Sequence, residues 1–152
     1  MAWTTSGLFV AQWIDSLDAT RCKFDLSLTT HKVYMTNNSD TPNFSSDTAY
    51  TTTNEVSGTG YTAGGHILTG LNPAVTESPT GTLKYTHDAV SWTTATITAY
   101  GAKWYADANT AGNGVADALI FAAYFGGAYT STAGTFQITP AAGGLFTLDL
   151  TP

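Results

Sequence analysis

Residues 95–107, ATITAYGAKWYAD, alternate between apolar and polar side chains, and residues 117–127, DALIFAAYFGG, form an almost continuous apolar run. Alternation with a period of two places successive side chains on opposite faces of a strand. An unbroken apolar run is typical of a strand that is covered on both faces. The two stretches therefore predict two strands, of which the second lies centrally in a sheet.

Shorter segments on either side repeat the strand pattern. Turn residues separate them at the spacing expected of a β-sandwich, and no helical segment recurs between them. The sequence therefore predicts an all-β fold, an antiparallel β-sandwich of about eight short strands that is immunoglobulin-like or jelly-roll-like. We expect residues 24–152 to form this single domain, with strands in the segments FDLSL (24–28), VYM (33–35), HILTGL (66–71), TLKYTHD (82–88), TFQITP (135–140) and GGLFTLDL (143–150).

The N-terminal segment has a different period. Its apolar residues follow the i, i+3, i+4, i+7 spacing of one helical face, which consists of Val10, Trp13, Ile14 and Leu17. This spacing predicts a short helix over about residues 6–18, with Ser6 as its cap. We expect Trp13 and Leu17 to dock the helix on its own sheet or on a neighbouring subunit. Residues 1–23 would then form a helical arm, and its removal would leave the β-domain folded.

A long polar segment, residues 37–54, interrupts the strands. Pro42 breaks any regular structure there, and Phe44 and Tyr50 are the expected anchors. Loops of this length inside a compact domain are typically contact or binding segments.

Residues 54–65, NEVSGTGYTAGG, contain four glycines. A phosphate-binding loop needs a lysine after the glycines and a helix directly behind them, whereas here a predicted strand follows and no lysine is present. We therefore interpret Gly58, Gly60, Gly64 and Gly65 as positions of positive φ or close backbone approach, with Tyr61 packed beneath the turn.

The composition argues against several classes of function. Only 11% of the residues are charged, compared with roughly 25% in an average globular protein, and the formal net charge is −6. The five scattered cations cannot neutralise a run of phosphates, so no nucleic acid is expected as a partner. The sequence contains no apolar run of transmembrane length and no convincing signal peptide, so we expect no membrane partner.

Catalytic and metal sites are not expected either. Cys22 is the single cysteine, and His31, His66 and His87 do not have the spacing of a zinc site. Ser57 lies outside any nucleophile elbow, and the acidic residues fall mostly in predicted loops and turns. We therefore predict no enzymatic activity and no cofactor. A glycan-binding surface is an alternative, because carbohydrate binders stack sugars on aromatic platforms such as one formed by Trp92, Tyr100, Trp104 and Tyr105.

Several segments resemble a family of small structural proteins that tailed bacteriophages encode. The resemblance spans residues 33–148 and is strongest at residues 55–65 and at Phe125-Gly126-Gly127 with Gly134. The segments that carry it are NSDTPNFSSDTAY (38–50), NEVSGTGYTAGG (54–65), VSWTTATITAYGAKWY (90–105), LIFAAYFGG (119–127), GTFQI (134–138) and GGLFTL (143–148).

This resemblance implies a decoration or cement protein on the outer surface of the phage head. Its partners would be the major capsid protein and further copies of itself, with a trimer favoured over a dimer. A tail or fibre subunit and a glycan-binding module on the particle are the alternatives. We expect the contacts in the helical arm, in residues 37–54 and in the turn at residues 112–114; the candidate contact residues are Trp3, Leu8, Phe9, Trp13, Pro42, Phe44, Asn109 and Asn113.

Overall fold

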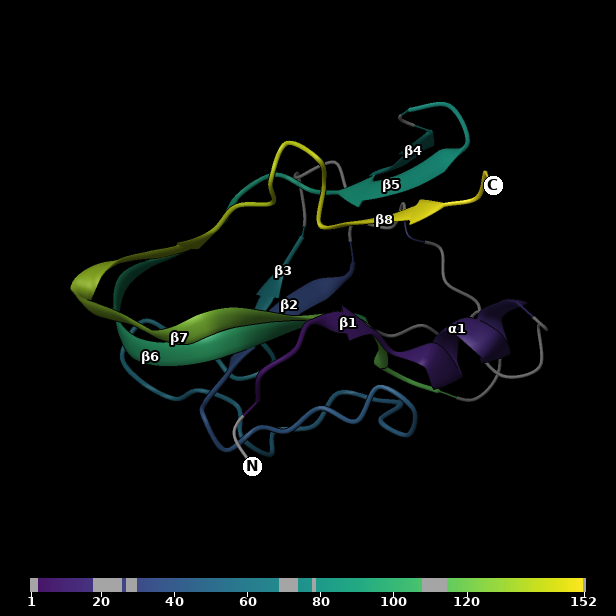
Figure 1. Ribbon diagram of the computed structural model, residues 1–152. Helices are drawn as coiled ribbons and strands as arrows, with labels where there is room; N and C mark the ends of the chain where they lie inside the picture. The colour runs from purple at the N-terminus through teal and green to yellow at the C-terminus, as the bar shows by residue number, and fades with distance from the viewer. Residues whose placement is uncertain are drawn as a thin grey trace.

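The computed structural model describes residues 3–17, 26, 30–68, 74–77, 79–107 and 115–151. Within these residues the strands form two antiparallel sheets, which confirms the predicted all-β, sandwich-like fold (Figure 1). The larger sheet has the order β1-β7-β6-β2-β3 and the smaller one β4-β5-β8. The elements are β1 (Gly7–Leu8), α1 (Val10–Leu17), β2 (Lys32–Thr36), β3 (His66–Ile67), β4 (Ala74–Glu77), β5 (Thr82–Thr86), β6 (Val90–Ala106), β7 (Ala118–Ile138) and β8 (Phe146–Asp149). The strand predicted at residues 24–28 lies largely outside the described residues.

A long two-stranded ribbon, made of β6 and β7, dominates the larger sheet. These strands have 17 and 21 residues, so the expectation of short strands was wrong here, and the strand predicted at residues 135–140 is the end of β7. Register shifts interrupt the pairing near Ala95, where the ribbon curls towards the smaller sheet (Figure 1). Thr94 and Ala133 have positive φ values of 53° and 49° at this corner. Such bulges bend a strand without ending it, so β6 and β7 stay paired on both sides of the bend.

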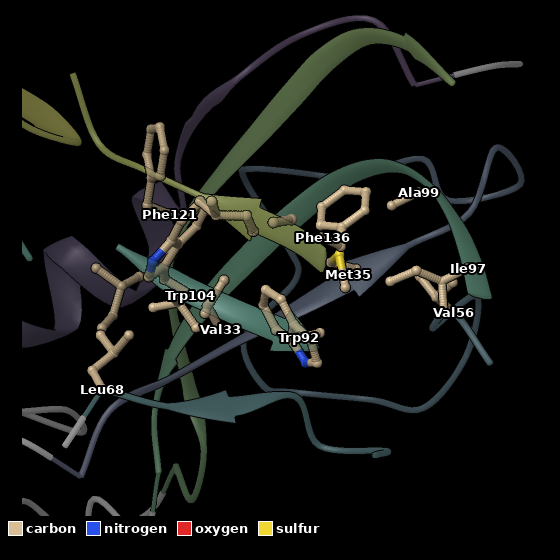
Figure 2. Packing of buried hydrophobic residues seen from close by; sticks show 14 of the residues in the cluster. Val33, Met35, Val56, Leu68, Trp92, Ile97, Ala99, Trp104, Phe121 and Phe136 are labelled. Atoms are coloured by element: carbon tan, nitrogen blue, oxygen red, sulfur yellow. The ribbon is translucent and has the colours of Figure 1, made fainter. Parts of the chain in front are cut away.

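The main hydrophobic core lies between the two sheets. Trp104 and Phe121 pack with ring centroids 5.6 Å apart, and Trp92 meets Phe136 edge to face (Figure 2). Met35 of β2 lies in the same cluster. Side chains alternate along β2 and β6, so Tyr34 and Tyr105 point to the opposite face of the larger sheet. Because both are buried, other parts of the chain must cover that face.

Residues 37–54 and the N-terminal segment provide that cover. Together they enclose a second cluster that contains Trp3, Phe9, Tyr34 and Tyr105. The alternating pattern at β2 predicts one buried face, but residues 33–36 are buried on both faces, because this covering layer occupies the side that the pattern assigns to water.

The N-terminal segment is part of the fold rather than an appendage. β1 pairs with β7, and Gly101 lets the Trp3 ring lie against β6, because a Cβ atom there would overlap the indole. The helix begins at Val10, later than predicted, and the Ser6 hydroxyl accepts a hydrogen bond from the Tyr124 amide instead of capping the helix. A chain without this segment would lose two buried aromatic side chains.

Candidate functional site

Glu55 organises the glycine-rich segment. Its Oε1 accepts hydrogen bonds from the Tyr61 hydroxyl at 2.7 Å and from the Gly64 amide at 2.8 Å. Its Oε2 accepts one from the Tyr50 hydroxyl at 2.7 Å. Tyr61 in turn accepts a hydrogen bond from the Met35 amide at 3.0 Å, so the tyrosine expected beneath the turn joins it to β2. All three hydrogen-bond donors belong to the same chain, so the Glu55 carboxylate holds the turn in place.

The glycines of this segment lie against strand backbones, as the sequence predicts. A Cβ atom on Gly58 would overlap the Thr96 carbonyl oxygen, and one on Gly60 would lie 2.9 Å from Ala95 Cα. A Cβ atom on Gly65 would overlap the Val33 carbonyl oxygen. Because strand backbone occupies the space beside these glycines, the segment is a close-packed turn.

The candidate contact residues occupy different environments. Trp3 and Phe9 are buried in the second cluster, so their expected role as surface contacts is wrong. Leu8, Trp13, Pro42 and Phe44 are half-buried, and Phe44 packs on Phe9 with ring centroids 5.3 Å apart. Asn109, Asn113 and the turn at residues 112–114 lie outside the described residues.

Helix α1 presents most of its apolar residues to solvent. Val10, Ile14 and Leu17 are 49%, 55% and 84% exposed, whereas Gln12 is buried and its amide donates a 2.7 Å hydrogen bond to the Thr48 carbonyl oxygen. The half-buried Trp13 docks the helix as predicted, with its indole donating to the Ile120 carbonyl oxygen at 3.2 Å. Leu17 does not dock on the sheet of its own chain, and its contact with a neighbouring subunit, the other expected place, stays a prediction. We call Val10, Ile14 and Leu17 the apolar helix face.

The aromatic platform suggested by the sequence is absent from the described surface. Trp92, Trp104 and Tyr105 are buried and Tyr100 is half-buried, all on the single strand β6. Trp92 and Trp104 lie in the main core and Tyr105 in the second cluster, so these three rings cannot stack on an external sugar.

His87 joins the connection after β5 to the core. The Trp104 indole N–H donates to His87 Nε2 at 2.9 Å, and because an indole nitrogen only donates, the His87 proton resides on Nδ1. Nδ1–H in turn donates to the Asp88 carbonyl oxygen at 2.6 Å. Burial lowers the pKa of His87 from its usual 6.5, although Asp88 acts in the opposite direction. The imidazole is therefore a neutral structural bridge.

A polar cavity of about 410 Å³ lies between residues 40–54 and the larger sheet. Lys103 of β6 and Asp40 form an ion pair in its lining, with Nζ to Oδ2 at 2.9 Å. No local sequence pattern identifies this pair. The one indication in the sequence is a lysine within a strand whose other side chains are apolar or carry hydroxyl groups. A charge buried at such a position requires a partner of opposite charge.

Neither a metal site nor a membrane-spanning helix is found in the described part of the chain. No group of three or more histidine, cysteine or acidic side chains there has the arrangement of a metal site. His31 and His87 are buried in different surroundings, and Cys22 lies outside the described residues. No helix among those described is long and apolar enough to cross a bilayer.

Comparison of this chain with protein-family models, with curated proteins and with solved structures finds no match. The geometry of the described residues and the sequence resemblance are therefore the basis for a functional proposal.

Proposed function

We propose that this protein is a structural component of a tailed bacteriophage particle, of the decoration or cement type. It would bind the outer lattice of the major capsid protein and hold neighbouring capsomers together. The observation that carries the attachment proposal is the apolar helix face. A chain that stays alone in water gains nothing from three exposed apolar side chains on one short helix, whereas a chain with a partner buries them.

The remaining surface is compatible with repeated contacts. Thr96, Thr98 and Thr130 are exposed on the β6–β7 ribbon, and the Thr98 and Thr130 hydroxyls hydrogen-bond each other at 2.9 Å. Neutral hydroxyls are cheaper to desolvate than charges, so such a face suits association with many identical neighbours. Modest contacts repeated over a shell add up through valency. The net charge of −6 favours a position outside the shell, away from packaged DNA.

We further propose that the protein self-associates, as a trimer in preference to a dimer, because closed symmetric assemblies match the local symmetry of a capsid lattice. Sedimentation of the purified protein measures this directly. If the protein sediments as a monomer at all concentrations, the proposal of self-association is wrong. Capsid attachment does not depend on this result and is tested separately.

Immunogold microscopy of purified particles from the phage that encodes this chain tests the location. Label on the heads supports the proposal. Label confined to the tail or its fibres would replace it with the alternative of a tail subunit, and particles without the protein would refute a structural role in the virion.

A reattachment experiment tests the contact surface. Heads that lack the protein are mixed with purified chain and sedimented. We expect the triple variant Val10→Ser, Ile14→Ser, Leu17→Ser to co-sediment at least tenfold less, since each buried apolar side chain contributes about 1.5–3 kcal/mol. The matched control is Leu150→Ser, which removes a side chain that is 72% exposed near the C-terminus. Equal loss in both variants would contradict a specific role for the helix.

A further inference from the structure

The ion pair between Lys103 and Asp40 holds an amine nitrogen against a carboxyl carbon. Lys103 Nζ lies 3.0 Å from Asp40 Oδ1 and 2.9 Å from Oδ2. Because both oxygens are bonded to Cγ, the nitrogen also lies within the roughly 3–3.5 Å of that carbon from which a bond can form. The two residues are 63 positions apart in the sequence, so the fold alone brings them together.

The pair is buried and its hydrogen bonding is incomplete. The Lys103 and Asp40 side chains are only 4% and 8% exposed, and Asp40 Oδ2 is out of reach of solvent. In the part of the chain that the structure describes, no other donor reaches Oδ2 and no second acceptor is found for Nζ. Buried charges without further partners are costly. An amide bond between the two groups would keep one N–H and one C=O and would remove both charges.

The side of the pair that faces the larger sheet is apolar. Lys103 lies directly opposite Tyr34 of β2 and Ala122 of β7, and side chains in such positions share one face of a sheet. Both neighbours belong to the second cluster. Burial, followed by the charge of Asp40, raises the pKa of Tyr34, so its hydroxyl stays protonated. This buried hydroxyl has no hydrogen-bond partner among the described residues.

From this geometry we propose that Lys103 and Asp40 condense after folding to an isopeptide bond, an amide between Nζ and Cγ. The bond would fasten residues 37–54 covalently to β6. Two groups that a fold holds in contact react as if one of them were present at about 10⁵–10⁸ M. The proposal does not depend on a place in the virion, so its test and that of capsid attachment have separate outcomes.

The condensation needs no further reactant. The ammonium first transfers a proton to the carboxylate, since burial favours the neutral amine and the neutral acid. Rotation about the Asp40 Cβ–Cγ bond, whose torsion is broad, turns the face of the carboxyl group to the amine. The nitrogen lone pair forms the C–N bond, and the Tyr34 hydroxyl donates a hydrogen bond to the oxygen on which negative charge develops. A proton then passes from nitrogen to the hydroxyl oxygen, the C–O bond breaks, and one water leaves into the adjoining cavity.

Mass spectrometry of the intact, denatured chain after prolonged incubation at neutral pH is the test. We expect most molecules to weigh one water less than the sequence requires. Trypsin cleaves after free lysine, so Lys103 should stay uncut and residues 33–84 should be joined to residues 85–152. A full mass would overturn the proposal. Loss of water with normal cleavage after Lys103 would overturn it too, because the change would then lie elsewhere in the chain.

Two variants and one internal control locate the reaction. Lys103→Arg keeps the positive charge, but a guanidinium stays protonated and does not attack, so this variant should keep its full mass. Loss of water from it would overturn the proposal. The more exposed pair of Lys32 and Asp107 should not condense, and a cross-link there would contradict the role of burial. Tyr34→Phe should slow the loss of water at least about tenfold, and an unchanged rate would overturn the role of the hydroxyl.

Discussion

Replacement of Gly65 by alanine tests the interpretation of the glycine-rich segment. Gly65 has a φ of 75°, and an added Cβ would overlap the Val33 carbonyl oxygen and lie 2.6 Å from Val33 C and 2.7 Å from Tyr34 Cα. These are backbone atoms of β2, which pairs with β6 on one edge and with β3 on the other. Because both neighbours hold it, β2 cannot move away from the new methyl group.

The expected cost follows from two contributions. Left-handed backbone in a residue with a Cβ costs about 1–2 kcal/mol. Relief of the overlap requires β3 to shift on β2, and each buried hydrogen bond lost in that shift costs about 1–3 kcal/mol. We therefore expect Gly65→Ala to lower the free energy of unfolding by at least about 3 kcal/mol, a large fraction of the 5–15 kcal/mol typical of a domain.

Two matched variants separate strain from overlap. Gly64 has a φ of 90°, but its added Cβ would meet only the Tyr105 hydroxyl at 3.7 Å, so Gly64→Ala should cost the backbone strain alone, about 1–2 kcal/mol. Gly127 has no atom within 4 Å of an added Cβ and no positive φ, so Gly127→Ala should change stability by less than about 0.5 kcal/mol.

Urea unfolding followed by tryptophan fluorescence provides the three free energies. The chain has four tryptophans, of which Trp3, Trp92 and Trp104 are buried, so unfolding changes the emission. A Gly65→Ala variant no less stable than Gly64→Ala would refute the close-approach argument. A comparable loss in Gly127→Ala would show that alanine is simply unfavourable throughout these turns and strands.

Three further predictions concern charge, protonation and the N-terminal segment. Lys103→Met should destabilise the fold by about 3–5 kcal/mol in the same urea assay, because it leaves the Asp40 carboxylate buried without its cation. The control is Lys32→Met. Lys32 forms an ion pair with Asp107 in which the two side chains are 29% and 28% exposed, so this variant should cost less than about 1 kcal/mol. His87 has a lowered pKa in the folded chain, so the unfolded chain binds more protons once the pH falls below about 6.5. The urea concentration at the unfolding midpoint should therefore decrease from pH 7.5 to pH 5.5. A His87→Gln variant should show a smaller decrease. Deletion of residues 1–9 removes the buried side chains of Trp3 and Phe9, each of which contributes about 3–5 kcal/mol to stability. The deletion should therefore abolish cooperative thermal unfolding. An unchanged melting temperature would instead support the prediction that these residues form a detachable arm.

Patterns with a clear period predicted the architecture well. The alternation in β6 and the continuous apolar run of β7 come from side-chain burial, which is the signal that periodicity measures. The length of these strands was not predictable in the same way, because residues 128–134 separate the two segments, 117–127 and 135–140, that the sequence pattern identifies as strands. Their role as a bulged corner depends on pairing with the bend near Ala95, a contact between distant parts of the chain.

The helix shows where periodicity fails. The spacing of Val10, Ile14 and Leu17 identifies an apolar face, but it does not say which face meets the sheet. The choice depends on the carbonyl groups of Thr48 and Ile120, which accept hydrogen bonds from Gln12 and Trp13. Both hydrogen bonds have partners at distant positions in the sequence, and no local pattern contains that information.

The polar residues that shape the cavity were also invisible to local patterns, because each has its partner far away in the sequence. Residues 37–54 contain little regular structure, yet they form one wall of the cavity beside the buried ion pair. They hold their position because Tyr50 stacks on Tyr105 with ring centroids 4.8 Å apart and donates its hydroxyl proton to Glu55. Glu55 in turn holds the glycine-rich turn through Tyr61 and the Gly64 amide. A loosely held loop would admit water to Lys103 and let its charge be solvated. The close backbone packing at the glycines is therefore what allows a mostly hydroxyl-bearing segment to keep a charge buried beneath it.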